Sequence, residues 1–343
     1  MRLLLFFICL ITLTSFSISK EIRKYELAGQ AQGTDYTITY FATDSLVSKT
    51  DIDNLLNKID LSMSLYKKNS LINQFNNANK SIKTDKFIRD VLKRSFEINT
   101  DTKGLFDITV APLVQAWGFG PKETRQEPDS TTIKSILQCV GMQNLLFKGD
   151  MLLKSKSCIN IDLNGIAQGY SVDLIAEYLE QKGLKQYVAE LGGEIRVSGP
   201  KPNGESIKIG IEGPGDHGTP TIRHIAAINS GAITTSGNYR KFHQSGTKTI
   251  SHLINPKTGY PLNNEMISVT VYANDAITAD GYDNSLMSMH INEAINFVEK
   301  RKNLEAYFVY KNQQGKIVDT LTSGFKKLII PENQFKNQTD EKK

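Results

Sequence analysis

Segments with helix and strand periodicity alternate irregularly along this chain, and their order constrains the fold more than any other feature. Apolar residues follow the helical period after Thr50 and again after Thr84, whereas Tyr36, Ile38 and Tyr40 alternate with threonines as a half-buried strand does. Further strands are expected at 187–191, 195–197, 207–211, 225–234 and 267–272, and further helices at 130–140, 278–289 and 292–301. Because a parallel α/β sheet needs regular alternation, the order predicts an α+β fold with mixed or antiparallel sheets and flanking helices.

The mature chain is expected to form one domain. It has 343 residues before processing and is 39% hydrophobic, enough to bury a core. No Pro/Gly/Ser-rich linker or internal repeat divides 20–330, whereas 331–343 is rich in Asn, Gln, Lys and Glu and is expected to be a disordered tail. The net charge of +5 comes from scattered basic residues and gives no reason to expect a nucleic-acid partner.

The first 19 residues have the pattern of a signal peptide. Arg2 precedes an apolar stretch of roughly 14 residues at 3–16, too short for a typical membrane span. Ser17 and Ser19 supply the small residues that a signal peptidase reads, so we expect cleavage after Ser19 and export. An uncleaved membrane anchor is the alternative. Lipidation of Cys9 is disfavoured because small residues do not precede it.

Cys139 and Cys158 are the cysteines that remain after export. In an oxidising compartment they can form a disulfide, or they can be two separate buried thiols. The sequence leaves both alternatives open.

The block 104–120 points to a ligand. It places an acid, a threonine and the only tryptophan of the chain among glycines, just after the expected end of a helix. This combination is too polar for a core strand and too aromatic for an ordinary loop, so a flat polar ligand is expected there. A strand through Ile159 and Ile161, a turn at Gly165 and a helix from Gly169 follow, a unit that can bind anions against free backbone N–H groups.

A pair of oxygen donors near the end of the chain suggests a metal ion. Asp280 and Asn284 stand four residues apart in an expected helix, so both project from one face. Such donors suit a Mg²⁺ that takes phosphate oxygens as further ligands. The alternative is a helix N-terminus with acidic residues that suit its macrodipole.

Read together, several stretches resemble the ApbE family of FAD:protein FMN transferases. The resemblance runs in the family's order from about Gln32 to the strand near Thr320. Besides 104–120, it rests on Gln-Gly-Thr-Asp-Tyr at 32–36, Ser-Leu-Tyr at 64–66 with Ser70 and Asn76, Ile-Asp-Leu-Asn-Gly-Ile-Ala-Gln-Gly-Tyr at 161–170, and Ser-His-Leu-Ile-Asn-Pro-Lys-Thr-Gly-Tyr-Pro at 251–261.

The resemblance implies a single ApbE-like domain with an FAD cleft and assigns residues to it. The implied metal site holds Mg²⁺ through the Gly165 carbonyl, Asp280 and Asn284, and the implied catalytic residues are His252 and Asp280. The family usually has Thr in place of Asn284 and often Lys in place of Gln168, which leaves a neutral contact to the phosphates here. The implied FAD contacts are Gln32, Tyr66, Leu105, Phe106, Asp107, Asp162, Gln168 and Ile254.

The reaction implied is Mg²⁺-dependent transfer of FMN from FAD to a Thr or Ser hydroxyl of a partner protein, with release of AMP. Implied partners are exported or membrane-bound electron-transfer subunits, which places the protein in the periplasm, free or attached to the inner membrane. The same residues would also serve an FAD pyrophosphatase that yields FMN and AMP, or a non-catalytic flavin-binding protein. The segment 230–234 vaguely resembles an acceptor site, but its apolar, strand-like setting argues against self-modification.

Overall fold

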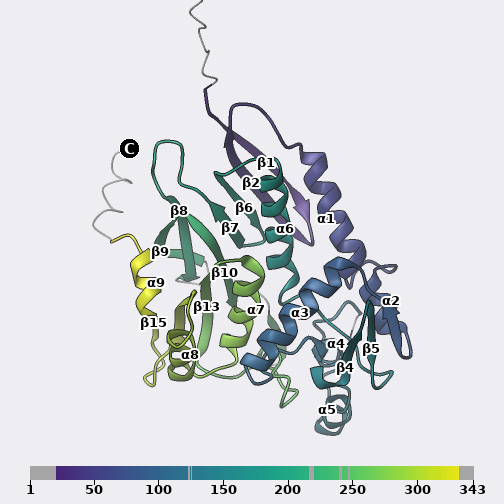
Figure 1. Ribbon diagram of the computed structural model, residues 1–343. Coiled ribbons are helices and arrows are strands. Elements are labelled where there is room, and N and C mark those ends of the chain that lie inside the picture. Colours follow the sequence, from purple (N-terminus) through teal and green to yellow (C-terminus); the bar gives the residue numbers. More distant parts are fainter. Residues whose placement is uncertain are drawn as a thin grey trace, which may run out of the picture.

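The computed structural model describes residues 21–331 except 123, 125, 216–219, 239–241 and 246–247 (Figure 1). The predicted signal peptide at 1–19 and nearly all of the predicted tail at 331–343 lie outside the described residues. Within the described part, strands and helices build an α+β fold, as the irregular order of segments predicts.

An eight-stranded sheet forms the centre of the fold, and each neighbouring pair in it is antiparallel. Its strands, in spatial order, are β1 (Arg23–Ala31), β2 (Thr34–Ala42), β6 (Tyr187–Leu191), β7 (Glu194–Ser198), β10 (Ser230–Gly237), β13 (Met266–Ala273), β14 (Leu304–Lys311) and β15 (Ile317–Leu321). Three smaller sheets consist of β3 (Ser81–Lys83), β5 (Met151–Lys154) and β4 (Leu145–Lys148); of β8 (Ile207–Pro214) and β9 (Pro220–Ile228); and of β11 (Phe242–Ser245) and β12 (Lys248–Ser251).

The helices lie mostly beside the central sheet, with α6 and α7 next to its middle strands (Figure 1). They are α1 (Lys49–Met63), α2 (Leu71–Asn77), α3 (Lys86–Asp101), α4 (Ala111–Ala116), α5 (Ser130–Leu137), α6 (Ala167–Gln181), α7 (Ala276–Met287), α8 (Ile291–Glu299) and α9 (Ser323–Leu328), with short 3-10 turns η1 (Ile108–Val110) and η2 (Met142–Asn144). Over the described residues, no helix combines the length and the apolar character needed to cross a membrane.

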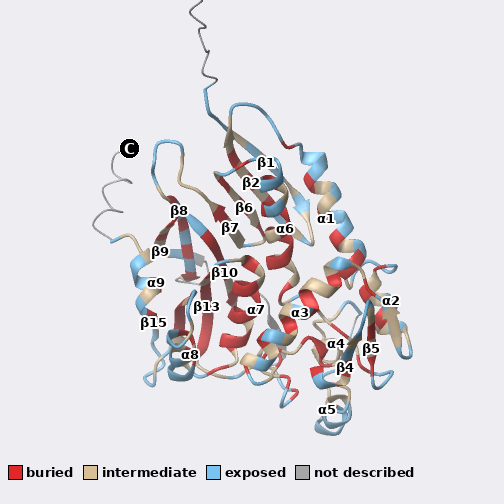
Figure 2. Ribbon diagram, in the orientation of Figure 1, coloured by how far each residue is buried: buried red, intermediate tan, exposed pale blue. Residues whose placement is uncertain are grey.

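Alternate residues of the central strands serve two cores. On β14, Ala306 and Phe308 face the main core with α1, α3, α6 and α7, while Tyr307 and Val309 face a smaller core with β8, β9 and α9. Figure 2 shows β10, β13 and α7 as largely buried. The sheet is thus covered on both faces, and α7 is a central rather than a surface helix.

Two predicted strands differ from the structure. The segment 225–234 is divided between β9 and β10, which belong to different sheets. Gly231 after the break has a φ of +92°, a conformation that L side chains rarely adopt. The predicted strand through Ile159 and Ile161 is wrong, because 159–163 has no strand partner. Instead the Asn76 side chain accepts from the Ile161 N–H at 2.7 Å and donates to its carbonyl at 3.0 Å.

The first helix also begins earlier than predicted. Ser48, not Thr50, is its N-cap, and it forms a capping box with Asp51. Tyr66 nevertheless lies just beyond the end of this helix, as expected.

Candidate functional site

A cavity of about 780 Å³ opens between α1, the block 105–119, the turn 162–168, the loop 252–256 and α7. Its volume is in the range of small-molecule sites, which is roughly 300–1,000 Å³. The cavity is lined by Gln32, Gly33, Ile59, Asp60, Met63, Ser64, Tyr66, Lys67, Leu105, Phe106, Asp107, Ile108, Val110, Val114, Phe119, Asp162, Asn164, Gly165, Ala167, Gln168, His252, Leu253, Ile254, Pro256, Asn284 and Ser288. Apart from Asp280, every residue that the resemblance implied for the site is among them.

The cavity mouth combines an exposed aromatic ring with a constrained turn. Tyr66 follows α1 with 70% of its surface exposed, so one face of its ring is free for a ligand. Gln32 occupies the turn between β1 and β2, where its φ of +53° is followed by a Gly33 φ of +78°. Its Nε2 donates to Ser171 Oγ at 2.9 Å, which fixes the amide on α6.

Asp107 shapes the cavity wall through bonds to the protein itself. Its carboxylate accepts from the Thr109 N–H at 2.8 Å, the Thr109 hydroxyl at 2.5 Å and the Met142 N–H at 3.2 Å. Burial raises its pKa, and these hydrogen bonds oppose that shift. The neighbouring Phe106 is only 6% exposed and packs into the main core. The wall therefore offers a ligand mainly backbone and ring surface, since the carboxylate of Asp107 already has three donors.

Asp162 connects the wall at 105–108 to the turn 162–168. Its N–H donates to the Ile108 carbonyl at 2.8 Å, and its Oδ1 accepts from the Asn164 N–H at 2.8 Å. Burial raises the pKa of its carboxyl group. The turn that follows carries Gly165 and Gln168 into the cavity.

The three residues expected to hold a metal converge where this turn meets α7. Asn284 Nδ2 lies 3.3 Å from the Gly165 carbonyl oxygen, 3.5 Å from Asp280 Oδ1 and 3.0 Å from Asp283 Oδ1. It also lies 3.1 Å from the Asp280 backbone carbonyl oxygen, so the amide N–H₂ group faces four oxygens, as a cation would. Asn284 Oδ1 accepts from Ser236 Oγ at 3.3 Å, and a half-turn about the Cβ–Cγ bond would exchange the two amide atoms.

Asp280 lies behind the cavity surface. It is 4% exposed, and its Oδ2 accepts from the Gly169 N–H at 2.8 Å, which leaves Oδ1 toward Asn284. Burial, and secondarily the nearby Asp173 carboxylate, raise its pKa to about 7. Burial and the charge of Asp280 raise the pKa of Asp283 as well. Two buried carboxyl groups this close favour a bound cation or a bound proton.

Few kinds of side chain could bind a metal ion at this place. Throughout the part of the chain that the structure describes, His, Cys, Asp and Glu side chains do not gather in groups of three or more that could hold a metal. A site at this place must therefore use the Gly165 carbonyl and the Asn284 amide beside the carboxylate. That donor set suits Mg²⁺ better than a transition metal.

The His252 loop closes the remaining side of the cavity. His252 lies in an edge-to-face contact with Phe119, with ring centroids 6.2 Å apart. Trp117 Nε1 donates to the Gly259 carbonyl at 2.8 Å, so the only tryptophan anchors this loop besides packing under the site. Ile254 packs with Leu113 and the α4–α5 unit.

Cys139 and Cys158 form a disulfide with a Cα–Cα distance of 5.6 Å, which decides between the two alternatives for these cysteines. The bridge ties the end of α5 to the segment that leads into Asp162.

Several site residues were not predicted from the sequence. Asp60, Lys67 and Phe119 line the cavity, and Asp283 accepts the Thr234 hydroxyl at 2.7 Å next to the metal donors. Asp60 follows Ile59 on α1, so the helical period alone indicates only that it borders a buried face. Asp283 is indistinguishable in sequence from an acid that suits the helix dipole.

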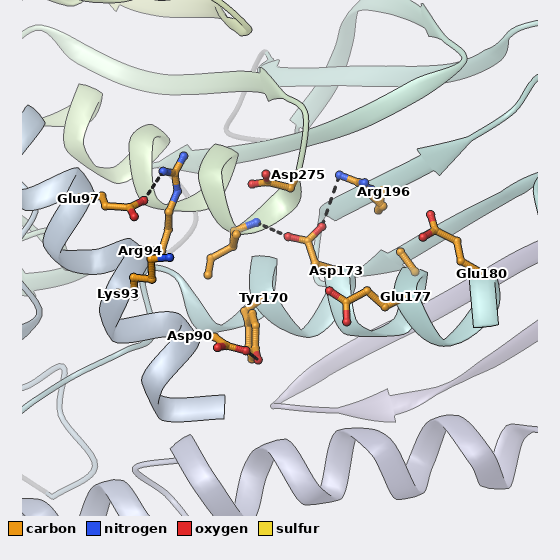
Figure 3. A pocket seen from close by; sticks show the side chains of 12 residues that line it. Asp90, Lys93, Arg94, Glu97, Tyr170, Asp173, Glu177, Glu180, Arg196 and Asp275 are labelled. Carbon is orange, nitrogen blue, oxygen red and sulfur yellow. Dashed lines mark hydrogen bonds and ion pairs between the residues drawn. The ribbon is translucent and has the colours of Figure 1, made fainter. Parts of the chain in front are cut away.

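A second, separate cavity of about 360 Å³ lies at the beginning of α7 (Figure 3). It is strongly charged and shares no lining residue with the first cavity. Its lining residues are Asp90, Lys93, Arg94, Glu97, Tyr170, Asp173, Ala176, Glu177, Glu180, Arg196, Asp275 and Ile277.

Comparison with known proteins gives this geometry a family. The ApbE family model matches residues 32–308, a range that includes every residue lining the larger cavity. The chain belongs to the ApbE family.

Curated relatives within the ApbE family are similar over most of their length. The FAD:protein FMN transferase of Haemophilus influenzae is 32% identical over 322 residues, covering 90% of this chain and 92% of the relative. The FAD:protein FMN transferase of Vibrio cholerae is 36% identical over 280 residues, covering 79% and 83%.

Solved ApbE structures share the fold. The flavin transferase ApbE from Vibrio cholerae superposes with a TM-score of 0.81 at 32% identity, covering 90% of this chain and all of that one. The apo flavinyl transferase ApbE of Pseudomonas stutzeri gives a TM-score of 0.80 at 29% identity, covering 90% and 97%. The predicted α+β class is therefore confirmed.

Proposed function

We propose that this chain transfers FMN from FAD to a threonine or serine hydroxyl of a partner protein and releases AMP. The observation that carries the proposal is the larger cavity, because it gathers all eight residues that the ApbE resemblance implied as FAD contacts. The similar proteins named FAD:protein FMN transferase support the same activity.

The donor set around Asn284 fits a Mg²⁺ ion. In the structure an N–H₂ group faces the Gly165 carbonyl and the carboxylates of Asp280 and Asp283, so the place already favours positive charge. Gly165, Asp280 and Asn284 would hold the ion. When bound, it would neutralise charge on the pyrophosphate and on the departing AMP.

The residues of the chain bind FAD and handle the proton. The exposed ring of Tyr66 offers stacking surface, the edge of the buried Phe106 lines the wall, and Asp162 and Gln168 offer polar contacts. The acceptor hydroxyl oxygen forms a bond to the FMN phosphorus, and the phosphorus–oxygen bond to AMP breaks. The hydroxyl proton passes to a ring nitrogen of His252, which lines the same cavity.

The acceptor would be an exported or membrane-bound electron-transfer subunit. The apolar N-terminus before Lys20 supports export, and the Cys139–Cys158 disulfide supports an oxidising compartment such as the periplasm. A self-modification at Thr234 is disfavoured, because this side chain is fully buried and donates to Asp283.

The test incubates the protein with FAD and Mg²⁺, with and without a candidate acceptor peptide. AMP together with labelled peptide supports the transferase. AMP with free FMN would instead identify an FAD pyrophosphatase, and intact FAD with a bound flavin would identify a binding protein.

Asp280→Ala tests the metal assignment within the same assay. Removing the proposed charged ligand should reduce FMN transfer by roughly a hundredfold or more, the scale of losing a main electrostatic stabiliser. Asp150→Ala is the control, since Asp150 is an exposed aspartate paired with Lys83 outside the cavity. Full transfer by Asp280→Ala at limiting Mg²⁺ would show that the assignment is wrong.

A further inference from the structure

The beginning of α7 is held by a residue that the proposed reaction does not use. In the second cavity, Asp173 of α6 points toward the first turn of α7 (Figure 3). Its Oδ1 accepts from the Ala276 N–H at 2.9 Å and its Oδ2 from the Ile277 N–H at 2.8 Å. Arg196 approaches the same carboxylate at 3.7 Å.

Together with the N-cap, Asp173 satisfies three free N–H donors at this end of the helix. Asp275 is the N-cap, and its Oδ1 accepts from the Thr278 N–H at 3.0 Å. The first four N–H groups at a helix start have no partner within the helix, and the two carboxylates here accept from three of them, those of Ala276, Ile277 and Thr278. The direction and depth of α7 are thereby fixed against α6.

The contact between the two helices is reciprocal. One turn before Asp173, the Gly169 N–H of α6 donates to Asp280 Oδ2 of α7 at 2.8 Å. One turn before Asp280 lies Ala276, the partner of Asp173. Each helix thus offers a carboxylate to the backbone of the other. On each helix the carboxylate and the N–H group that takes part lie four residues apart. We call these two contacts the α6–α7 clasp.

The clasp needs a very close approach of the helices. A Cβ atom on Gly169 would lie 2.4 Å from the Ala276 carbonyl oxygen and 2.7 Å from the Asp280 Cβ. Since normal contacts are longer than 3 Å, the glycine allows the two backbones to meet. Any loosening at Asp173 must therefore move Asp280 relative to the Gly165 turn that precedes α6.

We propose that Asp173 is a positioning residue for the metal site, which acts by holding α7 so that Asp280 and Asn284 face the Gly165 carbonyl. This inference rests on the proposed function, since it concerns the same Mg²⁺ site. Asp173 lines the second cavity and not the larger one, so it does not contact FAD in the proposed site.

Three variants separate positioning from charge. Asp173→Ala removes both acceptors. Asp173→Asn has nearly the same shape and keeps one acceptor oxygen, so it is the variant of choice if Asp173→Ala does not fold. Glu177→Gln is the matched control, since Glu177 is exposed, lies one turn further along α6 and lines the same cavity away from the clasp.

The first measurement uses Mn²⁺ as the probe. Free Mn²⁺ is followed by electron paramagnetic resonance as protein is titrated in the presence of FAD, with an FAD-only blank. We expect Asp173→Ala to weaken Mn²⁺ binding roughly ten- to a hundredfold, the scale for partners that orient metal ligands. Asp173→Asn should fall between this variant and wild type, and Glu177→Gln should bind as wild type does.

The second measurement is FMN transfer as a function of Mg²⁺ concentration. The half-activating concentration should rise for Asp173→Ala, while kcat at saturating Mg²⁺ recovers to within a few fold, because Asp280 itself is still present. General damage to the fold would lower kcat at every Mg²⁺ concentration.

The outcomes are distinguishable. Wild-type affinity in Asp173→Asn and in a folded Asp173→Ala would overturn the positioning role while leaving the proposed function intact. Equal weakening in Glu177→Gln would also overturn it, because the effect would then come from charge alone. Failure of the wild type to bind Mn²⁺ or to consume FAD would instead overturn the proposed function, and this inference with it.

Discussion

Removal of the Cys139–Cys158 disulfide should destabilise the protein by an amount that can be worked out from the structure. The bridge closes a separation of 19 residues. On the chain-entropy estimate, a loop of that length contributes about 3 kcal/mol by restricting the unfolded chain. With an unfolding entropy of about 2.1 cal/mol/K per residue over roughly 310 residues, the Tm should fall by about 5 °C.

The FAD site should tolerate this change. The residues that line the larger cavity all lie outside the interval between Cys139 and Cys158. Met142, Leu145 and Leu152 within the interval are buried in the main core, so the loop stays packed without the bridge. FMN transfer at 25 °C should therefore remain within about twofold of wild type, a change of under about 0.5 kcal/mol in the barrier.

The assay compares wild type with the Cys139→Ser, Cys158→Ser double variant by thermal unfolding and by FMN transfer. Neither cysteine is fully buried, so serine adds no buried polar group. Thiols are also counted in the denatured, unreduced mature protein. Two reactive thiols in the wild type, or a Tm shift below about 1 °C in the double variant, would refute the reasoning.

Three further predictions concern Gly169, Asn284 and Asp101. Gly169→Ala should destabilise the protein by about 1–3 kcal/mol, because its Cβ would force α6 and α7 apart; an unchanged urea midpoint would contradict the close approach. Asn284→Thr should keep FMN transfer equal or higher, since it restores the family's usual donor, and an inactive but folded variant would remove this position from the metal site. Hydrogen bonds from Arg301 lower the pKa of Asp101 below 3.8, so its contribution to stability is present above that pH and is lost as the pH falls through the folded-state pKa. Asp101→Asn should therefore show a lower Tm at pH 7 and a shallower fall of Tm between pH 5 and pH 3; a parallel decline in both proteins would be the contrary result.

The family, the fold class and most of the cavity wall were predictable from the sequence. Short blocks such as 104–120 and 161–170 carry residue types whose order matches a known family, and Gln32, Tyr66 and Ile254 all line the predicted cleft. Periodicity also located most helices and strands, because it depends only on near neighbours in the chain.

The detailed roles of charged and amide side chains depended on the tertiary structure. Asp107 was predicted as an FAD contact and lines the cavity, and only the structure shows that its carboxylate accepts hydrogen bonds from Thr109 and Met142. The strand expected at Ile161 is replaced by hydrogen bonds to Asn76, 85 residues away in sequence.

The proposed metal site shows most clearly what a local sequence pattern cannot predict. The spacing of Asp280 and Asn284 predicted that both project from one helix face, which the structure confirms. The spacing did not indicate that the N–H of Gly169, 111 residues away, donates to Asp280 Oδ2. Nor did it indicate that Asp173, 103 residues from Ala276, holds the start of α7. The sequence alone determines which face of a helix is polar, because that depends on the 3.6-residue repeat. The packing of α6 and α7 against the central sheet decides which partner meets that face. Such long-range contacts produce no periodic pattern in the sequence.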